Sequence, residues 1–296
     1  MRTCVIFNPA AKGDKARRFR RHLDEISTQS TLKLTTAPND ARRLAAEAVN
    51  QGFVNIVAAG GDGTVNEVIN GLGDAPEGFQ RSRLGVLPLG TVNVFARELA
   101  IPPKPELAWR IVCAEREISI DVPCVEYRAN GQAQRRYFAQ LAGAGLDARA
   151  VELVAWEMKK KIGVMAYILA GLRALAGPPA KITAAAGATA ATGALVLIGN
   201  GRLYGGSFRV FPNADLRDGL LEVCVFPRVN WLTLARCGPR LLLRGDLPPS
   251  VTKVFQAETL TLTSVGRVPF EIDGELAGDL PATFTIKRGG LRAIVP

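Results

Sequence analysis

The sequence predicts two domains of different classes: an α/β domain with a parallel sheet at residues 1–122, and a mainly antiparallel β-sandwich at residues 123–296. In the first part, short apolar runs alternate with helical patterns, which is typical of a parallel sheet covered by helices. In the second part, strand-like segments follow one another with turn signals between them, which indicates antiparallel pairing. A chain of 296 residues is long enough for two cores of this size.

The first domain is expected to contain four β-α units, followed by one more helix and strand. The strand and helix of each unit are expected at residues 3–7 and 15–26, 32–36 and 41–49, 54–59 and 64–72, and 84–87 and 92–99; the last helix and strand follow at 106–114 and near Ile118. Because ligands of parallel sheets bind at the carboxyl ends of the strands, functional residues of this domain are expected there.

The second domain is expected to consist of strands interrupted by two helical segments. The strands are expected at 124–127, 136–142, 181–185, 194–198, 219–226, 259–263, 268–272 and 283–287, and the helical segments at 151–175 and 231–243. Small residues dominate positions 184–192, where a flexible loop between strands is expected. The final strand could pack back on the first domain.

The composition predicts a protein with an anionic partner. The net charge of +10 and pI near 9.7 suit nucleic acid, a phosphorylated ligand or an anionic membrane surface. Only 6% of the residues are aromatic and no nucleic-acid-binding motif occurs, which disfavours nucleic acid. The longest apolar run, residues 162–172, is too short to span a bilayer, and the N-terminus lacks a signal-peptide pattern. We therefore expect a cytoplasmic protein.

Cysteine and histidine offer little chemistry in this chain. The five cysteines occur singly, without C-x-x-C pairs, and are expected to be reduced, buried thiols. The only histidine, His22, lies among charged residues of an expected surface helix. A general base is therefore expected to be a carboxylate.

The turn Gly60-Gly61-Asp62-Gly63-Thr64 lies between an apolar strand pattern and an amphipathic helix pattern. Its glycines can adopt positive φ and approach a ligand closely, and the following helix N-terminus offers unpaired N–H groups, which suits a polyphosphate. A simple tight connection is the alternative. The Asp62 carboxylate would repel a phosphate unless a divalent cation lies between them or the carboxylate holds amides of its own loop.

A second glycine turn, Leu89-Gly90-Thr91-Val92-Asn93, follows the next strand. Gly90 allows close approach, and Thr91 could cap a helix or donate to a phosphate. Either turn alone could be a plain N-cap, but two of them at adjacent strand ends predict one pocket.

Two acidic turns in the second domain are further candidates. Asp215 and Asp218, with a backbone carbonyl, could bind a hard divalent cation, or they could cap amides of an Asp-Gly hairpin turn. In Asp273-Gly274-Glu275, one carboxylate could accept a proton while the other orients it or a metal ion. A plain β-turn is the alternative there.

The stretch Gly143-Ala144-Gly145-Leu146-Asp147 mimics a dinucleotide-binding fingerprint. The acidic residue expected about twenty positions later is absent, and no second β-α unit follows. We interpret it as a packing turn. A Walker A motif is also absent.

The two helical segments of the second domain combine apolar residues with Trp and basic side chains. Such faces suit a membrane interface, although both helices could equally cap the sandwich and bury their apolar sides. We expect peripheral contact with an anionic membrane surface.

Together these motifs resemble the diacylglycerol kinase catalytic-domain family, and most of all the soluble bacterial lipid kinases of the YegS type, which are related to sphingosine kinases. The resemblance rests on Asn8-Pro9, the run from Gly60 to Leu72, the run from Pro88 to Arg97, Asn200-Gly201, Gly205-Gly206, Asp215-x-x-Asp218-Gly219 and Asp273-Gly274-Glu275. It implies an ATP- and Mg²⁺-dependent kinase that phosphorylates a hydroxyl of a lipid acceptor.

The resemblance also implies residue roles. Glu275, with Asp273 beside it, would accept the hydroxyl proton, and Asp62 would reach the catalytic magnesium ion. Asp215, Asp218 and the Leu220 carbonyl would hold a magnesium ion that supports the site. The nucleotide would contact Asn8, Thr36, Gly60, Gly61, Asp62, Gly63, Thr64, Val65, Asn66 and Thr91.

Two positions depart from the family pattern, Lys12 in the first phosphate loop and Val94 where the family has aspartate. These departures keep a catalytically silent nucleotide-binding regulatory protein as an alternative. A kinase of a soluble acceptor such as NAD is a second alternative, because the shared glycine loop says nothing about the acceptor. No nucleic-acid partner is expected, and a homodimer is possible.

Overall fold

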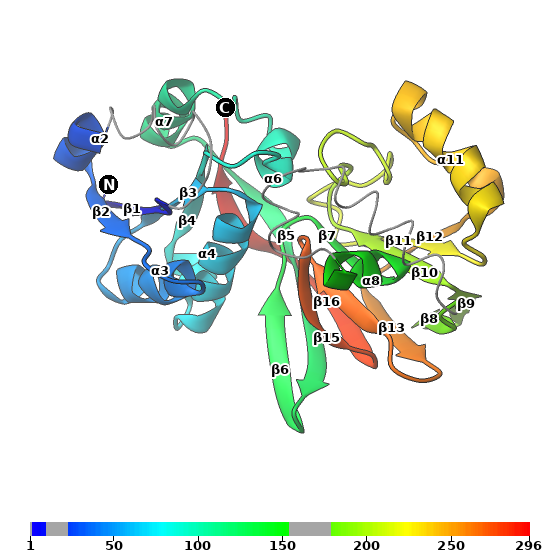
Figure 1. Ribbon diagram of the computed structural model, residues 1–296. Coiled ribbons are helices and arrows are strands. Elements are labelled where there is room, and N and C mark those ends of the chain that lie inside the picture. The colour runs from blue at the N-terminus through cyan, green and yellow to red at the C-terminus, as the bar shows by residue number, and fades with distance from the viewer. Residues whose placement is uncertain (1, 10–22, 154–178) are drawn as a thin grey trace.

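The computed structural model describes residues 2–9, 23–153 and 179–296, and it contains two sheets flanked by helices (Figure 1). The larger sheet has ten strands and the smaller one six. The expected helical segment at 151–175, the residue Lys12 and the residue His22 lie wholly or largely outside the described residues.

Parallel strands form the N-terminal part of the larger sheet, in the order β2-β1-β3-β4. Every residue of β3 is buried, because helices cover both faces of this part (Figure 1). The strands are β1 (Thr3–Phe7), β2 (Thr31–Leu34), β3 (Asn55–Gly60) and β4 (Arg83–Pro88), and the helices are α2 (Leu23–Gln29), α3 (Asp40–Asn50), α4 (Asp62–Asp74), α5 (Gly78–Arg81), α6 (Val94–Glu98) and α7 (Pro105–Ala114). The predicted α/β region with a parallel sheet is confirmed.

The C-terminal part is a β-sandwich. All pairs in the six-stranded sheet, in the order β12-β11-β10-β7-β14-β15, are antiparallel. Its elements are β7 (Leu141–Gly145), α8 (Leu146–Leu153), β10 (Leu195–Gly199), β11 (Leu221–Phe226), α11 (Trp231–Arg244), η1 (Pro249–Val251), β12 (Lys253–Ala257), β14 (Pro269–Ile272) and β15 (Glu275–Asp279). The predicted antiparallel class of this region is also confirmed.

The larger sheet continues into the C-terminal part through β16 (Ala282–Ile294). One end of β16 pairs in parallel with β4, and most of its length pairs antiparallel with β5 (Glu117–Ala129). The remaining strands are β6 (Gln132–Tyr137), β8 (Ile182–Ala186), β9 (Thr189–Gly193) and β13 (Thr259–Ser264). The predicted boundary at residues 122 and 123 falls inside the unbroken strand β5 and stays a prediction.

The expected loop at residues 184–192 is instead a hairpin. Strands β8 and β9 pair antiparallel from Ile182↔Gly193 to Ala186↔Thr189. Ile182, Ala184 and Ala191 face the sandwich core and are buried, so even small side chains follow the alternation of a strand. All five cysteines are free, and four of them are buried as expected, whereas Cys113 is exposed.

Candidate active site

The first glycine turn connects the carboxyl end of β3 to the N-terminus of α4. Although glycine can adopt positive φ, the glycines of this turn do not. Gly61, the N-cap, has φ −93°, and neither Gly60 nor Gly63 has positive φ. Close packing explains Gly60, because a Cβ there would lie 2.3 Å from Oγ1 of Thr64. No side chain caps α4, so the amides of its first turn are left for a ligand.

The second glycine turn packs directly against the first. A Cβ on Gly90 would lie 2.6 Å from Cα of Gly61, and the amides of Leu89 and Gly90 both donate to the carbonyl of Gly60 at 2.9 and 3.2 Å. The side chain of Asn93 closes the second turn through hydrogen bonds to the amide and carbonyl of Gly90. The two turns therefore form one backbone surface, as the sequence predicted.

Two further predicted nucleotide residues border this surface from β1 and β4. The side-chain amide of Asn8 donates to Oγ1 of Thr64 at 3.2 Å, and the Asn8 backbone amide donates to the carbonyl of Ala59 at 3.0 Å. Thr91 is exposed in the second turn. The ends of β1, β3 and β4 thus bring Asn8, Thr64 and Thr91 toward one edge of the sheet.

Thr36 follows the neighbouring strand β2 and is exposed. Its hydroxyl and amide both donate to Oδ2 of Asp40, at 2.6 and 2.8 Å. These bonds lower the pKa of the Asp40 carboxyl well below its usual range. Thr36 therefore stabilises the start of α3, and its contact with a nucleotide stays a prediction.

Asp62 lies at the start of α4 and reaches across to α6. Its Oδ1 accepts a 3.3 Å hydrogen bond from the amide of Phe95, in the first turn of α6. Burial raises the pKa of this carboxyl, while the amides of Phe95, Val94 and Asn93 act in the opposite direction. The sequence left open a divalent cation or amides of Asp62's own loop; the structure instead shows Asp62 accepting from an amide of the neighbouring turn.

Val65 and Asn66 point away from the glycine surface. Val65 is 3% exposed and packs in the core of the first domain, and its amide donates to the carbonyl of Gly61 at 3.1 Å. The buried Asn66 side chain donates to the carbonyl of Tyr137 at 3.2 Å and to Oδ2 of Asp273 at 2.7 Å. Both residues pack on the side of α4 away from the glycine surface, and their predicted contact with the nucleotide stays a prediction.

Asp273 is held on all sides by hydrogen-bond donors. Its Oδ1 accepts from the amides of Gln140 and Leu141 at 2.9 and 3.1 Å, and its Oδ2 accepts from the amide of Ala139 and the side chain of Asn66, both at 2.7 Å. Four donors occupy the lone pairs that a general base would need. We therefore assign Asp273 a positioning role.

Glu275 is the carboxylate that faces the glycine surface. Its Oε1 lies 3.0 Å from the place that a Cβ of Gly63 would occupy, so the side chain passes over the first turn of α4. Its Oε2 pairs with the guanidinium of Arg136 at 3.5 Å, and 49% of the side chain is exposed. Glu275 is thus both accessible and aimed at the first glycine turn.

The predicted metal turn holds its own amides. Oδ1 of Asp215 accepts from the amide of Arg217 at 3.1 Å, and Oδ1 of Asp218 accepts from the amide of Leu220 at 2.9 Å. Within the described ranges, no group of three or more His, Cys, Asp or Glu side chains is arranged for a metal ion. The hairpin-turn alternative accounts for these bonds, and metal binding stays a prediction.

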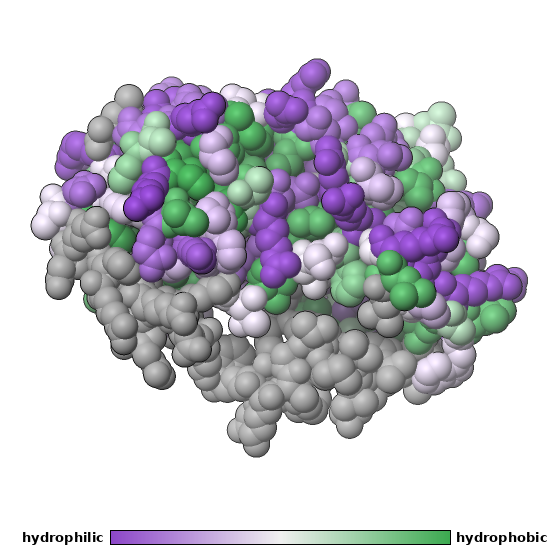
Figure 2. Space-filling model, turned by 90° about the horizontal axis from the view of Figure 1, so that it is seen from above, coloured by the Kyte–Doolittle hydropathy of each residue, from purple (hydrophilic) through white to green (hydrophobic). Residues whose placement is uncertain are grey.

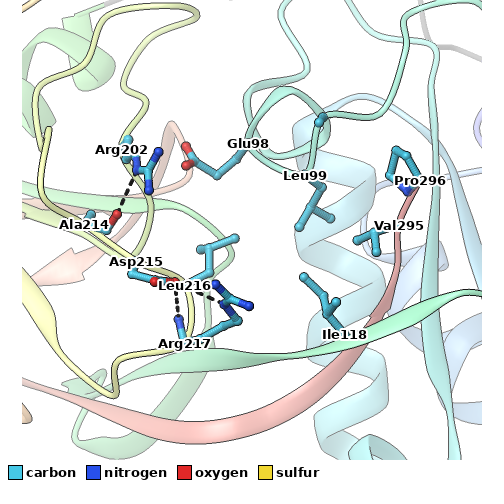
Figure 3. A pocket seen from close by; sticks show the side chains of 11 residues that line it. Glu98, Leu99, Ile118, Arg202, Ala214, Asp215, Leu216, Arg217, Val295 and Pro296 are labelled. Carbon is cyan, nitrogen blue, oxygen red and sulfur yellow. Dashed lines mark hydrogen bonds and ion pairs between the residues drawn. The ribbon is translucent and has the colours of Figure 1, made fainter.

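A hollow of about 380 Å³ borders the metal turn (Figure 3). Glu98 and Arg202 extend from opposite sides of it, and the Asp215–Arg217 pair lies at its edge. Its full lining is Glu98, Leu99, Ala100, Ile118, Arg202, Ala214, Asp215, Leu216, Arg217, Val295 and Pro296. None of the glycine-turn residues or Glu275 belongs to this lining, so the chemistry of the two turns, rather than this hollow, defines the candidate site.

Three residues of the site were not found from the sequence. Arg136 pairs with Glu275, Asn70 joins Asn66 in binding the backbone of Tyr137, and Asp121 accepts from the amides of Gly219 and Gly289 at 2.6 and 2.7 Å. Asn70 alone had a local signal, because it lies four residues after Asn66 on the same face of a helix.

A parallel-sheet domain with two paired glycine turns, approached by a carboxylate from a β-sandwich, defines a two-domain phosphotransferase. Sequence comparison agrees: the family described as "Diacylglycerol kinase catalytic domain" matches residues 2–125, and the family described as "YegS C-terminal NAD kinase beta sandwich-like domain" matches residues 140–295. The chain belongs to the YegS-like family, whose C-terminal domain model matches more than half of it, and its N-terminal part matches the diacylglycerol kinase catalytic domain.

Individual relatives match over nearly their whole length. A "Probable lipid kinase YegS-like" of Cronobacter sakazakii is 28% identical over 270 residues, which cover 90% of this chain and 86% of the relative. A "Diacylglycerol kinase" of Bacillus subtilis is 28% identical over 307 residues, covering 100% and 96%.

Two solved structures from Bacillus anthracis str. Sterne share the fold. One has a TM-score of 0.80 at 23% identity and covers 100% of this chain and 95% of that chain. The other, described as a diacylglycerol kinase, has a TM-score of 0.72 at 19% identity, with 100% and 97% covered. Among the helices that the structure describes, none is long and apolar enough to cross a membrane.

Proposed function

We propose that this protein transfers the γ-phosphoryl group of ATP to a hydroxyl of a lipid acceptor, in a Mg²⁺-dependent reaction. The family and the lipid kinase relatives support the lipid acceptor over a soluble one such as NAD. The observation that carries the proposal is the position of Glu275, a carboxylate of the second domain that lies over Gly63 at the N-terminus of α4.

Binding of the polyphosphate is assigned to backbone amides. The uncapped first turn of α4 presents N–H groups and the positive end of a helix dipole to an anion, and the adjoining turn at Gly90 packs against it. These donors are fixed by the packing of Gly61 against Gly90, so they need no reorganisation during the reaction. Phosphoryl transfer depends mainly on such positioning and electrostatic stabilisation.

Proton removal from the acceptor hydroxyl is assigned to Glu275. Its exposed carboxylate can accept a proton, and the ion pair with Arg136 orients it. Asp273 fixes the turn that carries Glu275, because its four hydrogen bonds anchor that turn to β7 and to α4. A hydroxyl bound between Glu275 and the α4 turn would face both the proton acceptor and the amides assigned to the polyphosphate.

The residues present fit Mg²⁺. Near the glycine turns the donor is the Asp62 carboxylate, which is half-buried beside the surface assigned to an anion and so favours a cation there. In the second domain the donors are the carboxylates of Asp215 and Asp218 and the carbonyl of Leu220, all of them oxygen ligands of the kind that Mg²⁺ prefers. When bound, Mg²⁺ would neutralise charge on the transferring phosphoryl group at the first position and support the fold at the second.

Contact with an anionic membrane surface is assigned to α11. Helix α11 lies at the right-hand end of the molecule (Figure 1), and at that end of Figure 2 apolar and polar side chains lie next to each other. Trp231, Leu232 and Leu243 of α11 are 66%, 57% and 85% exposed, and Arg236 and Arg244 lie on the same helix. Apolar side chains flanked by arginines suit the headgroup region of a bilayer. The cytoplasmic location and a homodimer stay predictions.

Incubation with labelled ATP, Mg²⁺ and a fractionated lipid extract tests the proposal. We expect label in a lipid fraction, and loss of this label in a Glu275→Gln variant that still binds ATP. Label transferred only to NAD or another soluble acceptor would contradict the lipid assignment. ATP binding with no transfer to any fraction would instead favour a regulatory protein.

A further inference from the structure

Two acidic side chains, Asp147 and Glu271, meet beneath the hairpin that carries Glu275. Asp147 lies in the first turn of α8, and Glu271, which is 1% exposed, lies on β14. Gly143 on β7 makes room for both: a Cβ there would lie 2.2 Å from Oδ2 of Asp147 and 2.9 Å from Oε1 of Glu271. The two carboxyl oxygens therefore crowd the same small space above a glycine.

The hydrogen bonds of this pair leave one place for a proton. Oε2 of Glu271 accepts from the amide of Gly274 at 2.6 Å, and Oδ1 of Asp147 accepts from the hydroxyl of Tyr204. Oε1 of Glu271 is buried and has no donor among the described groups, and it faces Asp147. Two ionised carboxylates at this separation would repel each other, whereas one proton between them satisfies both oxygens.

The surroundings favour retention of that proton. Burial raises the pKa of the Asp147 carboxyl, and burial together with the charge of Asp147 raises the pKa of Glu271 well above its ordinary value. Among the described residues, the other titratable groups that face the pair are Tyr204 and Asp273. Farther out, Arg267 pairs with Glu152 of α8 and Asp279 of β15, and Glu275 of β15 pairs with Arg136.

We propose that Asp147 and Glu271 share one proton and act as a positioning pair for the catalytic turn. The pair holds the amide of Gly274, and thereby the turn between Asp273 and Glu275, in place. Through Tyr204 it also connects this turn to the loop that leads to Asp215. The effect on catalysis rests on the proposed function, whereas the shared proton itself can be tested on the folded protein alone.

Amide substitutions distinguish a shared proton from ordinary packing. In Glu271→Gln, the amide nitrogen can donate to Asp147 as the acid does, and in Asp147→Asn, the amide can donate to an ionised Glu271. In the double variant an oxygen can face an NH₂ group only if one amide turns, and that turn places its NH₂ group against the hydroxyl of Tyr204 or the amide of Gly274. We therefore expect each single variant to keep kcat within about threefold of wild type and the double variant to lose about tenfold or more beyond the product of the two single effects.

The pH dependence of unfolding gives a readout that does not need activity. Because the pKa of Glu271 is raised in the folded state, the folded protein binds more protons than the unfolded chain above the ordinary glutamic acid pKa. The free energy of unfolding of the wild type should therefore fall as the pH rises from that value to the raised pKa. Glu271→Gln should remove this decrease in the free energy of unfolding. We also expect the kcat of the wild type to decrease as the pair loses its proton at higher pH, and Glu271→Gln should remove that decrease too.

Glu222→Gln is the matched control for the kinetic profile. Glu222 is also a buried glutamate whose pKa is raised by burial, but it lies on β11 and bonds to Gln256 at 2.7 Å. This variant should keep the decrease in kcat at higher pH that we expect for the wild type. It should also combine additively with Asp147→Asn.

Two results would overturn the shared proton: an unchanged pH dependence of unfolding in Glu271→Gln, or a double variant no worse than the product of its single effects. A protein that phosphorylates no acceptor would defeat the proposed function. The unfolding measurements would still decide the protonation of the pair, so the two failures are distinguishable.

Discussion

The side-chain amide of Asn66 donates a 2.7 Å hydrogen bond to Oδ2 of Asp273, although the two residues are 207 positions apart in the chain. Asn66 lies on α4, whose N-terminus forms the glycine surface, and Asp273 lies in the turn before Glu275. This bond therefore joins the helix assigned to ATP to the turn assigned to the proton acceptor. It explains how a strand pair of the sandwich holds a fixed position relative to the first domain.

Asp273→Asn should lower stability as well as activity. The four donors now bind both carboxylate oxygens of Asp273, whereas asparagine has only one acceptor oxygen. At least one buried N–H group therefore loses its partner. We expect the free energy of unfolding to fall by roughly 2–5 kcal/mol, because each unsatisfied buried donor costs roughly 1–3 kcal/mol. Chemical denaturation measures this, and a variant as stable as wild type would show that these four hydrogen bonds do not hold the turn.

Glu275→Gln should lose activity without losing stability. Half of this side chain is exposed and its contact with Arg136 is long, so little folding energy depends on it. If Glu275 is the proton acceptor, kcat should fall by about 10²–10⁴-fold while the melting temperature stays unchanged.

The matched control for this substitution is Glu126→Gln. Glu126 is an exposed glutamate on β5 that also pairs with an arginine of β6, Arg135, the neighbour of Arg136. It should keep wild-type kcat. Equal activity of the two variants would remove Glu275 from the mechanism.

Gly90→Ala should separate the two glycine turns. Its new methyl group would lie 2.6 Å from Cα of Gly61, which is backbone and cannot rotate away. We expect a loss of stability of about 1–3 kcal/mol and an ATP Kd about tenfold higher. Calorimetric titration with ATP and Mg²⁺ measures the binding.

Gly238→Ala is the control for Gly90→Ala. Gly238 lies within α11, just before Pro239, and a Cβ there would meet no atom within 4 Å outside its chain neighbours. Because a side chain before proline is disfavoured in a helix, which offsets the gain from replacing a helical glycine, this substitution should change stability by less than about 1 kcal/mol and leave ATP binding unchanged. ATP affinity equal to wild type in Gly90→Ala would refute the role of the packed turns.

The order of the β-α units and the meeting of the two glycine turns could be predicted from the sequence, because parallel strands place their carboxyl ends at one edge. The role of each glycine could not. Gly60 and Gly61 do not use the positive φ that glycine allows. Glycine is needed there because a side chain at Gly60 would contact Thr64 and one at Gly61 would contact Gly90. That need arises from the pairing of β3 with β4, which a local pattern does not contain.

Long-range contacts account for the other differences. Asp273 and Glu275 look equivalent in the sequence, and only the amides of residues 139–141 and the side chain of Asn66 distinguish them. The interpretation of residues 143–147 as a packing turn fits Gly145, which has φ +93° and lies tightly against Ala194. The partner of Asp147, however, is Glu271 on a strand far away in the sequence, so the acid pair had no local signal.

Asp218→Asn should abolish stabilisation by Mg²⁺ at the acidic turn. Its Oδ1 accepts from the amide of Leu220, and asparagine can keep this bond while it removes the charge that a cation needs. For the wild type, Mg²⁺ at ten times its Kd should add about 1.4 kcal/mol to the free energy of unfolding. Asp74→Asn, at an exposed acid paired with Arg42, should keep that gain. A wild type indifferent to Mg²⁺ would argue against a cation in this turn.

Trp231→Ser with Leu232→Ser should weaken binding to anionic vesicles. Both side chains are more than half exposed, whereas Thr233 and Cys237 on the opposite face of α11 are buried, so the fold should not depend on the changed pair. Transfer of an exposed apolar side chain of this size into a bilayer contributes about 1.5–3 kcal/mol, so vesicle binding should fall at least about tenfold.

Val265→Ser, at an exposed apolar residue in the loop between β13 and β14, is the control and should bind as wild type does. Because Arg236 and Arg244 contribute through charge, binding should also weaken as salt rises. Co-sedimentation with phosphatidylglycerol vesicles measures both effects, and wild-type protein that stays in the supernatant at low salt would exclude α11 as a membrane contact.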